Sequence, residues 1–220
     1  MMHARFLDRR DAGQALAASL ARHRGWQDPL VLALPRGGVP VAVEIATALG
    51  AELDVLGVRK VAHPSHPELA LAAIATGGAV ARNGAVIEAM GVDEAELEAL
   101  AAPERRELAR RERAYRGDKA PPRIAGRTVI VVDDGVATGA TMFAALATLR
   151  AQSPGKLVVA VPVAAADTLA VLQRAADEVA CLHAPADFMA VGAWYEDFPQ
   201  VTDDEVRACL RRAAPGAPPA

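Results

Sequence analysis

Aromatic residues and cysteines are scarce in this sequence, and no apolar run is long. Only 4% of its 220 residues are aromatic, and Cys181 and Cys209 are the two cysteines. Two cysteines cannot build a disulfide framework or a four-cysteine zinc site, so we interpret both as small buried residues in a reducing compartment. No apolar run approaches the roughly 18 residues that a membrane helix needs, and no apolar segment of a signal peptide follows the charged N-terminal stretch. The sequence predicts a soluble, cytoplasmic protein.

The chain also has no large excess of charge of either sign. The chain has 24 Lys and Arg residues against 27 Asp and Glu residues, which gives a net charge of -3. This balance argues against a surface built as a whole for nucleic acid. An apolar fraction of 52% and a charged fraction of 23% are typical of a globular protein. Because no linker divides the chain, we predict one domain over residues 1–213 and a disordered tail over residues 214–220.

Short apolar runs alternate with helical patterns along most of the chain. Strands are predicted at 30–34, 53–58, 128–132, 157–163 and 179–183, and helices at 39–49, 140–150 and 168–176. This alternation predicts an α/β fold, with a parallel sheet and helices on both faces. Between residues 61 and 78 the pattern weakens, and the segments LALAAIAT and GAVIEAM predict a small extended flap. Residues 94–116 predict a long charged helix that is broken or kinked at Pro103.

The segment VIVVDDGVATGAT, residues 129–141, is the most informative part of the sequence. A β-branched strand ends at Asp133 and Asp134, and a turn rich in Gly and Thr then leads into a helix. Ligands bind at the carboxyl ends of parallel strands, and the N–H groups at a helix N-terminus suit a phosphate. Two carboxylates would repel that phosphate unless they bind hydroxyls or a divalent cation. The residues therefore predict a site for a sugar phosphate with vicinal hydroxyls, together with Mg²⁺.

The same segment resembles the phosphoribosyl pyrophosphate (PRPP) motif of the type I phosphoribosyltransferases. The PRGG, VDDG and VG-x-WY-x-DF signatures resemble a little-characterised bacterial branch of that family. The resemblance covers roughly residues 30–163 and implies a Rossmann-like core at about 29–183. It also implies a flexible flap and a small hood, formed here by residues 1–28 and 184–213.

The resemblance implies a role for each motif residue. Asp133 and Asp134 would hold the ribose hydroxyls and the metal. The PRPP phosphates would be bound by two loops, which comprise Pro35, Gly37 and Gly38 in the first and Gly135, Val136, Ala137, Thr138, Gly139, Ala140 and Thr141 in the second. The cations expected to neutralise the leaving pyrophosphate are Arg36, Arg59 and Lys60. Without the motif, residues 34–38 could be an ordinary turn, and Arg59 and Lys60 ordinary solvated side chains.

The remaining candidates concern the flap and the acceptor. His63 and His66 lie in residues 61–68, which match the family's mobile loop, and no cysteine or acid nearby completes a zinc site. Four of the eight aromatic residues lie in residues 188–200, and we predict Trp194 and Tyr195 on the acceptor side, although such rings could equally brace the sheet edge. Ala137 stands where relatives that use 6-oxopurines carry an acid, which argues against that acceptor class.

The resemblance implies a Mg²⁺-dependent phosphoribosyltransferase, acting as a homodimer without membrane or nucleic-acid partners. It would transfer the phosphoribosyl group of PRPP to a nitrogen nucleophile and release pyrophosphate. The alternative is a regulator that senses PRPP or a nucleotide with little catalysis and that could bind RNA through the arginines of residues 105–116. Interleaved glutamates explain many of these arginines as helix salt pairs. A third option, a sugar-phosphate hydrolase that uses Asp133, lacks the further acids it would need.

Overall fold

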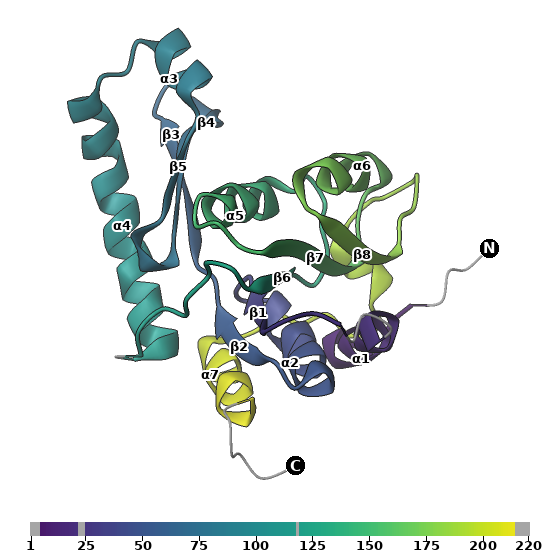
Figure 1. Ribbon diagram of the computed structural model, residues 1–220. Coiled ribbons are helices and arrows are strands. Elements are labelled where there is room, and N and C mark those ends of the chain that lie inside the picture. Colours follow the sequence, from purple (N-terminus) through teal and green to yellow (C-terminus); the bar gives the residue numbers. More distant parts are fainter. Residues whose placement is uncertain (1–4, 22–24, 118, 214–220) are drawn as a thin grey trace.

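A parallel five-stranded sheet forms the core of the computed structural model, which describes residues 5–21, 25–117 and 119–213 (Figure 1). The strand order is β2-β1-β6-β7-β8, and the neighbouring pairs are all parallel. The strands are β1 (Pro29–Ala33), β2 (Glu52–Val55), β6 (Thr128–Val132), β7 (Lys156–Val163) and β8 (Glu178–His183). The predicted α/β fold with a parallel sheet is confirmed. The tail predicted at 214–220 lies outside the described residues.

Helices cover both faces of this sheet, as the alternating pattern predicted. One layer contains α1 (Arg9–Leu20), α2 (Gly38–Leu49) and α7 (Asp203–Arg212), and the other contains α5 (Ala140–Arg150) and α6 (Ala166–Ala175). Val31 and Ala33 of β1 pack with the first layer, whereas Leu30 and Leu32 pack with the second. Strands buried on both faces read as continuous apolar runs, which is why residues 128–132 lack polar alternation.

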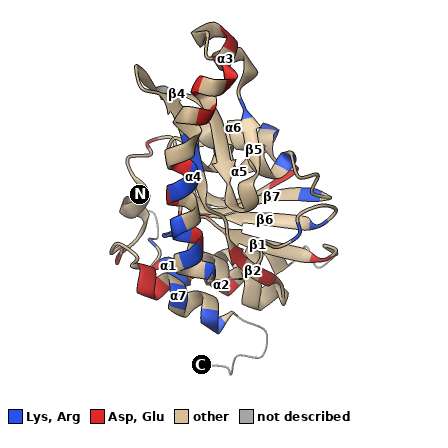
Figure 2. Ribbon diagram, turned by 90° about the vertical axis from the view of Figure 1, so that its left-hand side faces the viewer, with Lys and Arg blue, Asp and Glu red and all other residues tan. Residues whose placement is uncertain are grey.

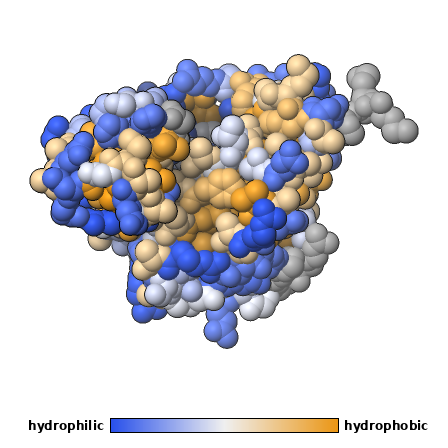
Figure 3. Space-filling view, turned by 90° about the horizontal axis from the view of Figure 1, so that it is seen from above, coloured by the Kyte–Doolittle hydropathy of each residue, from blue (hydrophilic) through white to orange (hydrophobic). Residues whose placement is uncertain are grey.

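The flap stands to one side of the core and has its own small sheet (Figure 1). Its strands β3 (Val58–His63), β4 (His66–Ala75) and β5 (Val80–Arg82) are antiparallel, and the short helix η2 (Thr76–Gly78) joins the last two. Leu97, Ala101 and Leu108 of α4 (Glu94–Arg116) bury their side chains against this sheet. Figure 3 shows that the molecule is notched between the flap and the core, with apolar side chains lining the notch.

Three predictions for the flap region were wrong. GAVIEAM forms α3 (Gly84–Met90), because Asn83 caps the N-terminus through Val86 N and Gly91 ends the helix in the left-handed region. α4 continues through Pro103, which lies on its exposed face, so the helix is not broken there. Pro64 and Pro67 predict irregular backbone between residues 61 and 78, yet His63 pairs with His66 and β4 runs through this region. This is possible because the register shifts between the pairs His63–His66 and Ala62–Ala70, so Pro67 lies in an irregularity of the ladder and has no ladder partner.

The segment before α1 meets residues 194–197 beside the core sheet. Phe6 N donates to Trp194 O at 2.9 Å, and Glu196 N donates to Phe6 O at 2.8 Å. These bonds join the approach to α1 with η3 (Val191–Trp194) and the irregular segment that follows it. Residues far apart in sequence thus form one cover next to the carboxyl end of β6. Among the described helices, none combines the length and apolar character that a membrane crossing requires.

Candidate functional site

Asp133 and Asp134 follow β6 directly and are held in place by the two ends of the chain. Arg9 Nε lies 2.8 Å from Asp134 Oδ2, and the Tyr195 hydroxyl donates to Asp134 O at 2.5 Å. The Asp134 N–H donates to Asp133 Oδ1 at 2.9 Å. Burial and the neighbouring Asp134 charge raise the pKa of Asp133 well above its usual value. Burial also raises the pKa of Asp134, and Arg9 opposes that rise.

The glycine loop predicted to bind pyrophosphate lies against this acid pair. A Cβ on Gly37 would stand 2.0 Å from Asp134 Oδ2, and a Cβ on Gly38 would stand 2.6 Å from Val132 O. Both distances are shorter than any real Cβ contact, so only glycine allows the two segments to approach so closely. Leu34 N donates to Val132 O at 2.9 Å just before the loop, and the Pro35–Arg36 peptide bond is cis. The structure therefore brings the two predicted motifs together.

The turn that precedes α5 leaves the helix N-terminus open. Gly139 occupies the position before the helix in the left-handed region, with a φ of 74°, and no side chain caps the first turn. Thr168 Oγ1 donates to Ala137 O at 2.6 Å and holds the turn from the side of α6. Thr138 and Thr141 are exposed. Free N–H groups, the positive end of the helix dipole and two accessible hydroxyls make this turn suitable for an anion.

The three predicted cations lie in two different parts of the structure. Arg36 lies in the glycine loop, with its guanidinium 3.7 Å from an oxygen of Asp203 at the start of α7. Arg59 pairs with Glu104 of α4 at 2.6 Å, and its neighbour Lys60 is exposed. Arg36 therefore reaches the site from the core, whereas Arg59 and Lys60 belong to the flap.

The histidines lie at the hairpin end of the flap. His63 Nε2 is 3.6 Å from Glu96 Oε1 of α4, and the His63 and His66 rings are 6.3 Å apart. Among the described residues, no three side chains of His, Cys, Asp or Glu gather as a metal site. In this arrangement His63 lies against α4, and His66 lies beside His63.

Trp194 and Tyr195 lie in a buried aromatic cluster at 8% and 3% exposure. The Tyr195 ring stacks on Phe198 at 4.7 Å and contacts Phe6 at 5.6 Å. Burial, followed by the charge of Asp134, raises the pKa of the Tyr195 hydroxyl. Such burial leaves little ring surface for a stacked acceptor, and the hydroxyl supports the Asp134 backbone instead.

Arg9 is the residue that the sequence interpretation missed. Its side chain is buried, Nη1 donates to Pro199 O at 2.8 Å, and the guanidinium carbon lies 3.7 Å from the centroid of the Phe198 ring. Arg9 shares the buried face of α1 with Ala12, Gly13 and Leu16. The helical spacing of positions 9, 12, 13 and 16 was visible in the sequence and could have placed this arginine on the inner face.

Known proteins are similar to this chain in sequence and in structure. Residues 6–193 match the family model described as the phosphoribosyl transferase domain. Two Mycobacterium tuberculosis proteins, from strains CDC 1551 and H37Rv and each named "Putative phosphoribosyl transferase", are 46% identical over 208 residues. These matches cover 94% of this chain but 47% of each relative, so the chain spans about half their length.

A crystal structure also matches closely. The protein TT1426 from Thermus thermophilus is 48% identical and superposes with a TM-score of 0.86, covering 94% of this chain and 97% of that one. The family match covers most of the chain, including the glycine loop and the acid pair. The chain belongs to the phosphoribosyl transferase domain family.

Proposed function

We propose that this protein is a PRPP-dependent phosphoribosyltransferase that transfers the phosphoribosyl group to a nitrogen nucleophile. One observation carries the proposal: a glycine loop, an acid pair and an open helix N-terminus adjoin at the carboxyl edge of one parallel sheet. A sugar that bears phosphate at one end, pyrophosphate at the other and two hydroxyls between them has complementary groups for all three.

Each part has a distinct task in this proposal. Asp133 and Asp134 accept hydrogen bonds from the ribose hydroxyls, and Arg9 and Tyr195 fix the position of Asp134. The N-terminus of α5 and the Thr138 and Thr141 hydroxyls bind the 5-phosphate. The backbone at Gly37 and Gly38 approaches the pyrophosphate, and Arg36 lies beside it. Catalysis would come from orientation and charge stabilisation, with no general base required in this chain.

The acid pair also suits a magnesium ion. Two adjacent carboxylates with raised pKa values are an oxygen-rich donor set that a divalent cation would stabilise in the charged form. Asp133 and Asp134 would hold the ion, directly or through the ribose hydroxyls. When bound with PRPP, the ion neutralises charge on the pyrophosphate.

The proposal is tested by pyrophosphate release. The protein is incubated with PRPP and Mg²⁺ together with purines, pyrimidines or simple amines, one at a time. We expect release with at least one acceptor and none without acceptor or metal. Because Ala137 replaces an acid in the phosphate turn, 6-oxopurines should be poor acceptors. A protein that neither binds PRPP nor releases pyrophosphate with any acceptor would contradict the proposal.

A PRPP-sensing regulator is the second candidate. It is favoured by Arg36 and Arg59, which both pair with acids of this chain, Asp203 and Glu104. A cation that already has a partner gives less stabilisation to a leaving pyrophosphate. Calorimetric binding of PRPP without release of pyrophosphate from any acceptor would favour this candidate over the enzyme.

A further inference from the structure

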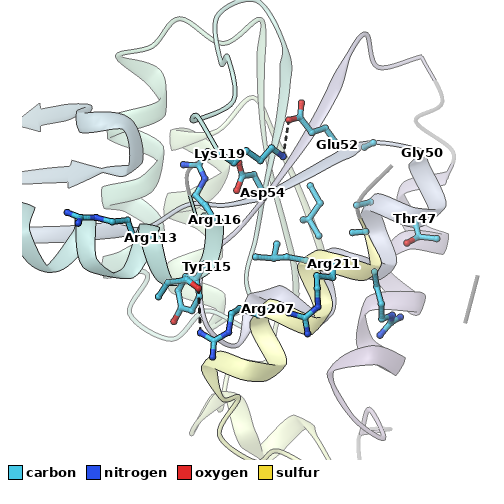
Figure 4. A pocket seen from close by; sticks show the side chains of 18 residues that line it. Thr47, Gly50, Glu52, Asp54, Arg113, Tyr115, Arg116, Lys119, Arg207 and Arg211 are labelled. Carbon is cyan, nitrogen blue, oxygen red and sulfur yellow. Dashed lines mark hydrogen bonds and ion pairs between the residues drawn. The ribbon is translucent and has the colours of Figure 1, made fainter. Parts of the chain in front are cut away.

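A large cavity lies between the core and the C-terminal end of α4. Its volume is about 950 Å³, and its walls come from α2, β2, α7, residues 113–117 and Lys119 (Figure 4). This volume is at the upper end of the range for pockets that hold small molecules. Ala51, Leu53 and Leu210 supply apolar wall, so the cavity can hold an organic group as well as charge.

Positive side chains dominate this cavity. Among the described residues that line it, the acids are Glu52 and Asp54, and the cations are Arg113, Arg116, Lys119, Arg207, Arg211 and Arg212. Figure 4 shows that these cations come from both sides, from the end of α4 and from α7. Figure 2 marks basic residues along the ribbon of α4 and again on α7.

Both acids are already neutralised by cations of the chain. Arg116 Nη2 lies 2.7 Å from Asp54 Oδ2, and Arg127 Nη1, from outside the cavity, lies 2.8 Å from Glu52 Oε2. By contrast, neither Arg113 nor Arg211 has an ion-pair partner within the described part of the chain. Arg207 pairs with Asp204, Arg212 with Glu44 and Lys119 with Glu52. Among the described lining residues, the uncompensated positive charge is therefore that of Arg113 and Arg211, which an anion would offset.

One buried polar atom also lacks a partner. The Arg116 side chain is 4% exposed, its Nη2 also donates to Ala120 O at 3.0 Å, and its Nε has no hydrogen-bond partner within the described ranges. A buried donor without a partner costs free energy, but this Nε is enclosed by protein atoms and is not itself offered to a ligand. The buried Arg116–Asp54 pair also anchors the end of α4 on β2, so this part of the cavity wall is built from fixed groups.

This cavity is separate from the proposed PRPP site. None of its described lining residues belongs to the glycine loop or to residues 133–141. A smaller hollow of about 220 Å³, lined by Arg36, Arg110 and Asp203 among others, lies between them, and Tyr115 contributes to both. Tyr115 donates to Asp203 Oδ1 at 2.7 Å and so connects α4 with α7 at this boundary.

We propose that this cavity is a binding site for a small molecule that carries two or more phosphates on an organic group. Arginine presents planar donors that match phosphate oxygens, and several arginines on facing helices suit a ligand with more than one phosphate. The apolar wall at Leu53 and Leu210 faces the organic group. A long nucleic acid is less well matched, because the charge is concentrated in a concave site and no cluster of exposed rings adjoins it among the described residues.

Titration calorimetry without Mg²⁺ tests this proposal, with sodium tripolyphosphate, ATP and adenosine as probes. We expect tripolyphosphate and ATP to bind, ATP more tightly, and adenosine to bind far more weakly. The variant Arg113→Glu with Arg211→Glu should weaken both phosphate probes by about tenfold or more, since hydrogen bonds to charged groups are among the stronger ones. Its PRPP binding in the presence of Mg²⁺ should be unchanged.

Two controls separate this site from other causes. Arg106→Glu with Arg174→Glu makes the same charge change at exposed arginines outside the cavity and should bind tripolyphosphate like the wild type. Thr141→Asp puts an acid in the proposed 5-phosphate turn and should also leave tripolyphosphate binding intact. Equal losses in both double variants, or loss in Thr141→Asp alone, would overturn the proposal. The proposal would also be overturned if ATP does not bind and a single-stranded RNA binds in a way that both double variants, at Arg113 and Arg211 and at Arg106 and Arg174, weaken.

Discussion

Arg9 and Asp134 form an ion pair at 2.8 Å although 125 positions separate them in sequence. The pair joins the first helix to the second residue after β6, next to the glycine loop. Arg9 also stacks on Phe198, whose ring stacks on Tyr195, and Tyr195 donates to Asp134 O. Both the side chain and the backbone of Asp134 are thus held by residues from the two ends of the chain.

The first prediction follows from this contact. Arg9→Met should weaken PRPP binding by about tenfold, because a charge-assisted hydrogen bond is lost and the pKa of Asp134 rises further. Arg9→Lys, which keeps the charge, should restore part of the affinity. Arg10→Met, at an exposed neighbour that pairs with Glu44, should leave affinity unchanged. Calorimetric titration measures these values, and a loss of melting temperature with unaltered PRPP affinity would show that Arg9 only stabilises the fold.

The second prediction concerns the acid pair. Asp133→Asn with Asp134→Asn should abolish turnover and weaken PRPP binding with Mg²⁺, while the protein stays folded. The fold tolerates the change because two buried neighbouring carboxylates repel each other, and an amide oxygen can still accept the Asp134 N–H bond. Asp187→Asn, at an exposed position, serves as the control. Unchanged PRPP affinity in the folded double variant would refute the assignment of these residues.

The third prediction concerns the close approach at Gly37. Gly37→Ala should displace Asp134 and weaken PRPP binding more than it lowers the melting temperature, because the new methyl group would stand 2.0 Å from Asp134 Oδ2. Gly84→Ala adds the same methyl group where nothing lies within 4 Å, near the start of α3. It should leave binding unchanged. Comparable PRPP affinities in the two variants would argue against a tight contact between the loop and the acid.

The fourth prediction concerns the phosphate turn. Thr141→Ala should cost about 1–3 kcal/mol of PRPP binding, the range for a hydrogen bond to a charged group. Thr141→Ser retains the hydroxyl and should bind nearly as well as the wild type. Ribose 5-phosphate should compete with PRPP in thermal-shift titrations of the wild type. If both variants bind alike, the backbone of the turn rather than this hydroxyl holds the phosphate.

The fifth prediction concerns the buried Arg116–Asp54 pair. Arg116→Met should lower the free energy of unfolding by about 3–5 kcal/mol at neutral pH, because it leaves a buried carboxylate unpaired. Arg113→Met, three residues earlier and exposed, should change it little. Urea unfolding measures both variants.

The same pair predicts a pH dependence with a definite sign. Burial raises the pKa of Asp54 more than Arg116 lowers it, so the folded protein holds this proton more readily than the unfolded chain. The contribution of Asp54 to the free energy of unfolding is therefore greatest at low pH, and it is lost as the pH rises through the pKa that Asp54 has in the folded protein. Without Arg116 the pKa of Asp54 rises further, so the stability deficit of Arg116→Met should shrink as the pH is lowered from neutral. A deficit that is constant with pH would exclude an unpaired Asp54 as its cause.

The sequence alone determined the core of this protein. Runs such as residues 128–132 are apolar throughout because both faces of their strands are buried, and the alternation with helical spacing indicates a parallel sheet. Asp133, Asp134 and the Gly/Thr turn are consecutive, so their position at a strand end and helix start is a local property that short-range pattern reveals. The glycine loop was predicted in the same way, because its residues are also consecutive and resemble a known motif.

Only the tertiary structure decided which distant residues complete the site. The sequence analysis did not single out Arg9, which is buried because α1 turns its side chain toward Asp134 and the Phe198 ring. Trp194 and Tyr195 were expected beside an acceptor, and the packing of Phe6 against them instead buries their rings. In the flap, LALAAIAT forms most of β4 as its apolar run predicted, but GAVIEAM forms a helix and Pro64 and Pro67 do not prevent the pairing of β3 with β4. Contacts between segments this far apart depend on how the layers pack, which local sequence patterns do not encode.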